Sequence, residues 1–350
     1  MKKTGLLIAI ALITMSACTN DELKNEEITQ SNSILIDPFV PKMQKSGDAT
    51  SITLENGIMI YAYENGKAYT SSPFINGVIF KKTTTYWESA PLYYWPMYAL
   101  DFYGFYPTSV VPTDIANPLD FTYTVNPSAE NEDDVVVAYK GDQTREIVDM
   151  QFHHALSKIS FTITTTANTG LNVIVNSIAL KNILMTADFT LDTLATGVPD
   201  YFEVTNPSSS GDATITPTSP VSVIASTTNV TSSPISALYV IPQTLTNWAY
   251  TQTSAFPLTG TYININGSLT GVADYVGNIA VPITTTAWQP GYHYIYNIVF
   301  GNPNGTSGGG GYNPDQGTDG DTKPEQILLP IQISVTVDTW DEINEPAIDL

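Results

Sequence analysis

One cysteine near the amino terminus stands in a setting suited to lipid chemistry. The chain starts with Met and two lysines, continues with an apolar run from Gly5 to Thr14, and reaches Cys18 through Met-Ser-Ala. Such a run is too short to span a bilayer and is typical of the apolar region of a secretory signal. Small residues before a cut site let the chain enter a peptidase in extended form. We therefore expect cleavage after residue 17 and lipidation of the Cys18 thiol.

The alternative is an ordinary signal peptide that happens to contain a cysteine. Cys18 is the only cysteine in the 350 residues, and this favours the lipid interpretation because the thiol stands where acylation needs it. The segment resembles the lipobox of bacterial lipoproteins, and it implies an outer-membrane anchor of two or three acyl chains, since one chain holds weakly. Asp21 and Glu22 resemble the acidic surface-export signal of Bacteroidetes lipoproteins. With one cysteine the chain can form no internal disulfide, so burial and hydrogen bonding must stabilise it.

The other residues of chemically active types show no catalytic pattern. The sequence has no H-E-x-x-H and no Walker loop, and its 34 acidic residues show no local pattern for glycoside hydrolysis. His153 and His154 are adjacent, so on a strand they point to opposite faces; we expect one to be buried and hydrogen-bonded. Asp315, Asp319 and Asp321 lack the closing glutamate of a calcium loop and are interpreted as flexible, solvated acids. We predict no enzyme activity, no metal and no cofactor.

Two further stretches have both a functional and a structural interpretation. The aromatic residues between Tyr93 and Tyr106 could stack on sugars, but such a run more often fills a sandwich core, which is the interpretation we favour. The acidic run from Glu130 to Asp134 is interpreted as a solvated turn. Neither stretch is predicted to be a binding site.

Charge and composition narrow the fold and the classes of partner. The formal net charge of −21 repels nucleic acid and anionic lipid heads, so we expect no nucleic-acid partner. Thr, Ser, Asn, Tyr and Val are plentiful, and only 13% of the residues are charged. Short runs with period two recur between Gly, Pro, Asn and Asp, which is typical of strands. We predict an all-β protein built from sandwiches.

Composition also divides the chain into segments. A polar, acidic stretch follows Cys18, and a tract with four consecutive glycines precedes the last strand pattern. The predicted segments are a signal peptide 1–17, a tether with an N-terminal strand 18–45, an N-terminal β-sandwich 46–148, a C-terminal β-sandwich 149–301, a flexible Gly-rich linker 302–326 and a C-terminal strand segment 327–350.

The final strand has the clearest alternation in the chain. Ile331, Ile333, Val335 and Val337 face one way, and the polar residues between them face the other. A long linker before such a strand means that it need not pair with its sequence neighbour. It can complete its own domain, or it can be donated to another molecule by β-strand addition. The sequence leaves both alternatives open.

Several short motifs, in this order along the chain, resemble the fimbrillin family of Bacteroidetes, which provides the subunits of type V pili and their relatives. Each motif is weak alone, but their order makes the resemblance specific. The matching segments are Leu92–Pro96 with Leu100–Pro107, Asp133–Ala138, Phe152–Ile159, Trp288–Tyr296 and Val335–Trp340.

This resemblance implies two tandem transthyretin-like β-sandwich domains and export as a lipoprotein. In stalk subunits of the family, an Arg-specific protease removes the N-terminal strand, and a strand from the next subunit fills the groove. The present sequence departs from that pattern because its only arginine is Arg145, far from the N-terminus. Lys42 and Lys45 lie where a cut would be needed. An anchor, tip or accessory subunit, or processing at lysine, would accommodate the difference.

Two functional hypotheses follow. In the first, the chain is a structural or adhesive subunit of a surface fimbria, with other fimbrial subunits as its partners. In the second, it is a monomeric, lipid-anchored surface protein that binds a glycan or a host protein. The sequence does not identify the adhesion ligand, and it does not distinguish a stalk from an anchor or a tip.

Overall fold

The computed structural model describes residues 32–40, 54, 57–68, 72–83, 85–128, 134–145, 147–165, 171–224, 228–229, 237–249, 258–271, 274–301, 311–317, 324–328 and 331–339. Cys18, Lys42, Lys45 and the whole predicted signal peptide lie outside these residues. Every element of the described part is a strand, from β1 to β22, as the all-β prediction requires. Within the same residues, no helix is long and apolar enough to cross a bilayer.

The amino-terminal half of the chain forms a closed sheet. Its strand order is β1-β4-β3-β2-β5-β7-β8, and β1 closes it by running parallel to β8 and antiparallel to β4. Apolar side chains at alternate positions, such as Ile60, Phe80 and Phe152, fill the interior. The strands are β1 Ile36–Phe39, β2 Ile58–Glu64, β3 Ile75–Lys82, β4 Trp87–Ser89, β5 Leu100–Tyr106, β7 Val136–Gln143 and β8 Val148–His154.

The borders of this first domain differ from the predicted ones. Strand β8 pairs with β1 and β7, so the predicted border between residues 148 and 149 falls inside a strand of the closed sheet. Strand β1 is the N-terminal strand expected within residues 18–45, but it belongs to the closed sheet of the first domain, and its Ile36 is fully buried. The first domain therefore extends from β1 to the end of β8 at His154.

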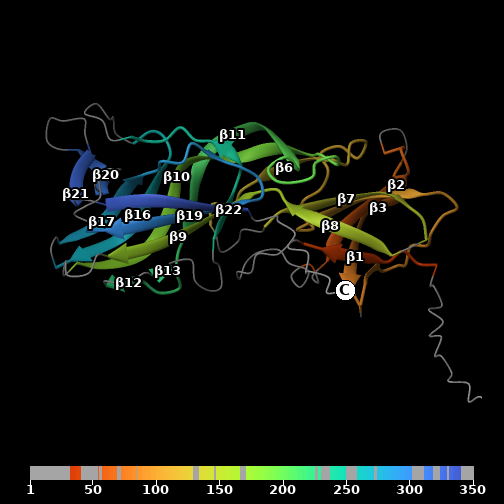
Figure 1. Cartoon of the computed structure of the whole chain (residues 1–350), viewed down its shortest axis with the longest axis horizontal. Coiled ribbons are helices and arrows are strands. Elements are labelled where there is room, and N and C mark those ends of the chain that lie inside the picture. The colour runs from red at the N-terminus through yellow and green to blue at the C-terminus, as the bar shows by residue number, and fades with distance from the viewer. Residues whose placement is uncertain are drawn as a thin grey trace, which may run out of the picture.

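The second domain is a sandwich of two sheets. One follows the order β11-β10-β16-β17-β20-β21, with β12 and β6 also on β10, and the other follows β13-β9-β19-β22, with β14 also on β9. Figure 1 shows the two domains one after the other along the long axis. The strands are β6 Asp120–Thr124, β9 Ser157–Thr165, β10 Asn172–Leu191, β11 Phe202–Ile215, β12 Val221–Ile224, β13 Thr228–Asn229, β14 Leu238–Val240, β15 Gln243–Thr244, β16 Tyr262–Thr270, β17 Tyr275–Pro282, β18 Ala287–Trp288, β19 Tyr292–Phe300, β20 Gly311–Gly317, β21 Pro324–Leu328 and β22 Ile331–Thr339.

Strand β6 ties the two domains together. It lies in the sequence of the first domain but pairs antiparallel with β10 of the second domain. Its Phe121 is fully buried and stacks on Phe189 of β10, with ring centroids 4.9 Å apart and planes 6° apart. The large apolar core of the second domain also includes Tyr61 and Phe105 from the first. The two domains therefore share a hydrophobic core and are not joined by a thin linker alone.

The segment expected to be a flexible linker contains two strands. Strand β20 pairs with β17 and with β21, so this part of residues 302–326 extends a sheet of the sandwich. The glycine at position 311 has a packing role, because a Cβ there would lie 2.6 Å from Ile279 and 2.7 Å from Ile331. Glycine lets the backbone of β20 approach the core closely. The end of the glycine tract therefore serves packing, which composition alone did not reveal.

Candidate functional site: two apolar strands and an interdomain cleft

Strand β22 lies at a sheet edge. It pairs antiparallel with β19 from Phe300↔Ile331 to Tyr292↔Thr339, and it pairs with no other described strand. Ile331 and Ile333 are 1% and 6% exposed, Val335 is half-buried, and Val337 is 45% exposed. In the single chain the strand thus lies in its own sheet, and its inward face becomes more exposed toward the carboxyl end.

Strand β1 occupies a slot between two other strands. It separates β4 from β8, and its removal would leave an edge on each side of an open groove. The alternate residues Ile34, Ile36, Pro38 and Val40 are buried. Ile36 is fully buried, whereas Ile34 and Val40 are 1% and 2% exposed. The first domain is therefore completed by a short apolar strand at the amino-terminal end of the described chain.

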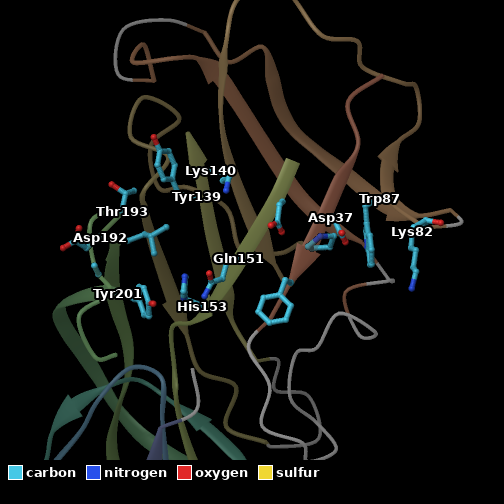
Figure 2. A pocket seen from close by; sticks show the side chains of 16 residues that line it. Asp37, Lys82, Trp87, Tyr139, Lys140, Gln151, His153, Asp192, Thr193 and Tyr201 are labelled. Atoms are coloured by element: carbon cyan, nitrogen blue, oxygen red, sulfur yellow. The ribbon is translucent and has the colours of Figure 1, made fainter. Parts of the chain in front are cut away.

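A cleft of about 680 Å³ lies where the outer face of the closed sheet meets the loop between β10 and β11. We call it the interdomain cleft. Figure 2 shows Asp192, Thr193 and Tyr201 on one side of it and Asp37 and Trp87 on the other. Its size is within the range of small-molecule sites.

Two acidic residues form part of the floor of the cleft. Asp37 of β1 and Asp149 of β8 are register partners on parallel strands, so their side chains lie on the same face. Burial raises the pKa of the Asp37 carboxyl; the nearby Asp149 carboxylate adds to this rise, and the Lys82 ammonium opposes it. Lys82 also lies over the ring of Trp87, 5.1 Å from its centroid.

Two comparisons with known proteins identify the fold, while none of the curated proteins matches the sequence. A family profile described as fimbrillin-like matches residues 46–314. The chain belongs to the fimbrillin-like family. A solved fimbrial protein from Bacteroides vulgatus is similar in fold, with a TM-score of 0.55, 14% identity, and coverage of 88% of this chain and 99% of that one. A protein from Bacteroides ovatus, with a suggested role in cell adhesion, gives a TM-score of 0.50, 12% identity, and coverage of 88% and 97%.

The aromatic residues between Tyr93 and Tyr106 of this fimbrillin-like chain were predicted to fill the core, and only some of them do. Phe102 and Phe105 of β5 are fully buried, and Trp95 packs edge-on against Phe102 at 5.7 Å. By contrast, Tyr94 and Tyr98 in the preceding loop are 54% and 42% exposed. The strand half of the motif and Trp95 are therefore structural, whereas Tyr94 and Tyr98 lie on the surface.

The two adjacent histidines, His153 and His154, point to opposite faces of β8. His154 is buried, and its Nδ1 lies 3.0 Å from a carboxylate oxygen of Asp134, so one histidine is buried and hydrogen-bonded as expected. Asp134 itself is 2% exposed, so the prediction that Glu130–Asp134 is a solvated turn is wrong for this residue. The pairing of β7 with β8 brings Asp134, just before β7, next to the end of β8. His153 points the other way, into the cleft, where it stacks on Tyr201 at 3.6 Å.

Of the remaining predicted residues, Asp319 and Asp321 lie outside the described residues, and Asp315 and Arg145 belong to different domains. Asp315 is exposed on β20 and accepts a hydrogen bond from Asn278, and the described residues hold no cluster of three potential metal ligands. Arg145 is exposed in the turn between β7 and β8. Sequence reasoning missed the cleft because Asp37 and Asp149 meet only through a parallel pairing of distant strands. Within each strand, the only local indication was the alternation that places Asp37 and Asp149 on the exposed face.

Proposed function

We propose that this fimbrillin-like chain is a structural or adhesive subunit of a type V-like surface fimbria, assembled by β-strand addition. The observation that carries the proposal is the position of β1, a short apolar strand that fills a slot between β4 and β8. If β1 left, the open groove would expose the unpaired backbone of β8 along four register positions, and of β4 beside Trp87, which a strand from another subunit could satisfy.

The inward faces of β1 and β22 match in period and in character. Ile34, Ile36, Pro38 and Val40 alternate inward in the first domain. The final strand offers four apolar residues at the same spacing, Ile331, Ile333, Val335 and Val337. In the proposed assembly, β22 of one subunit takes the place of β1 in the next, and Val337 occupies the position of Val40.

Processing at lysine suits this arrangement better than processing at arginine. Lys42 and Lys45 follow β1 in the sequence, so a cut after either residue would detach β1 from the rest of the first domain. A cut at Arg145 would instead divide the closed sheet between β7 and β8. We propose that the protease acts at Lys42 or Lys45.

The same proposal covers export and anchoring. Lipidation of Cys18 would carry the precursor to the outer membrane, before the cut after Lys42 or Lys45 separates the subunit from its lipid. The two domains are proposed to be transthyretin-like sandwiches, and the role is mechanical rather than enzymatic. N-terminal sequencing of the surface form tests this part, because it distinguishes an acylated Cys18 from a new terminus near Lys45.

Val337→Asp tests strand exchange most sharply. In the single chain this side chain is 45% exposed, so an aspartate should change the melting temperature little. In the proposed assembly it would enter the buried position of Val40, where an unpaired carboxylate is strongly unfavourable. We expect loss of SDS-resistant ladders from a subunit that melts like the wild type.

The matched control is Thr336→Asp, which places the same charge on the exposed, outward face of β22. It should assemble normally. Ladders of wild-type length from the Val337→Asp chain would exclude β22 as the donated strand.

A further inference from the structure

We propose that the interdomain cleft binds a neutral saccharide. This inference rests on the proposed surface location of the chain but not on strand exchange. A surface protein with such a site would attach to glycans through the interdomain cleft, without donating or accepting a strand.

The polar groups of the cleft suit a ligand with many hydroxyl groups. Carboxylates of Asp37, Asp149 and Asp192 only accept hydrogen bonds, while the ammonium groups of Lys82 and Lys140 only donate. The side chains of Gln151 and Thr193, which also line the cleft, both donate and accept. A hydroxyl also does both, so a saccharide can use all of these groups.

The charge of the cleft argues against a strongly charged ligand. Three carboxylates face two ammonium groups, so the cleft is nearly neutral on a chain whose net charge is −21. A polyanion would meet the carboxylates, and a polycation would meet the lysines. The chemistry therefore favours a neutral ligand.

Ring faces complete the site. Phe39 of β1 is 42% exposed and lines the cleft beside Gln151, its register partner on β8. The stack of His153 and Tyr201, which also lines the cleft, joins the closed sheet to the β10–β11 loop of the second domain. Aromatic rings offer apolar faces to the C–H faces of a sugar, and the nearby polar groups fix its orientation.

The site also depends on β1. Asp37 and Phe39 both belong to this strand, so a subunit in which another strand had replaced β1 would lose part of the floor. The saccharide would therefore bind chains that retain β1. Binding to the intact chain can thus be measured without any assembly step.

The experiment is saturation-transfer NMR on the intact chain with three kinds of probe: neutral oligosaccharides, a sialylated oligosaccharide and hexalysine. We expect a neutral oligosaccharide to bind, and Phe39→Ala and Gln151→Ala each to weaken that binding about tenfold. The matched control is Tyr98→Ala, which removes an equally exposed ring outside the cleft and should leave binding unchanged. Both test variants should keep the wild-type melting temperature.

Three results would overturn the proposal: no binding of neutral oligosaccharides at millimolar concentration, preferential binding of either charged probe, or binding that survives both cleft substitutions. The test is independent of the proposed assembly. Val337→Asp should bind the oligosaccharide normally, and Phe39→Ala should still form ladders. The two proposals can therefore fail separately.

Discussion

Asp134 and His154 form a buried pair at the point where the chain leaves the first domain. Their side chains are each 1% exposed and lie 3.0 Å apart. The pair connects the start of β7 to the last residue of β8, and only two residues separate β8 from β9 of the second domain. A polar contact in this position fixes the path of the chain between the domains, because a buried polar group that loses its partner is costly.

Asp134→Ala should therefore lower the free energy of unfolding by about 3 kcal/mol, since it leaves the buried His154 ring without this acceptor. Asp134→Asn has nearly the same shape and keeps an oxygen acceptor, so its cost should be clearly smaller. Urea denaturation monitored by tryptophan fluorescence measures both values. Equal losses for the two variants would show that the hydrogen bond contributes little to stability.

At the scale of elements, glycine permits the close pairing of β10 and β16. A Cβ at Gly267 would lie 2.0 Å from the carbonyl oxygen of Ile174, next to a register shift between Val175 and Ser177. Backbone cannot move aside as a flexible side chain can. Gly267→Ala should therefore force the two strands apart and cost about 1–3 kcal/mol.

The control for this element is Gly197→Ala in the loop between β10 and β11. A Cβ at that position would meet nothing within 4 Å. This substitution should leave the thermal midpoint near that of the wild type, whereas Gly267→Ala should lower it. Similar midpoints for the two variants would mean that the β10–β16 pairing tolerates a methyl group.

Period two along the chain was enough to predict the strands but not their partners. The alternation of Ile331, Ile333 and Val335 predicted a strand with one apolar face, and this strand forms. The pairing of Ile36 with Val148 could not be predicted in the same way, because it joins strands that lie far apart in sequence. Composition was misleading at Gly311, where glycine allows close packing rather than flexibility. Local patterns report which face is buried, while register across the molecule depends on contacts between distant residues.

At the scale of the whole molecule, the shared core should make the two domains unfold together. Tyr61 and Phe105 of the closed sheet belong to the same buried cluster as the sandwich, and β6 extends a sheet of the second domain. Such an interface resembles the interior of one domain more than a surface between two. Differential scanning calorimetry of the wild type should show a single transition.

Phe121→Ala should weaken this coupling. The ring is fully buried against Phe105, Phe189 and Phe202, so its loss should cost about 3–5 kcal/mol at the junction itself. We expect the single transition to broaden or split as the domains begin to melt separately. Phe80→Ala, which removes an equally buried ring from the interior of the closed sheet, should lower one joint transition without splitting it. Two separate transitions in the wild type would contradict this coupling.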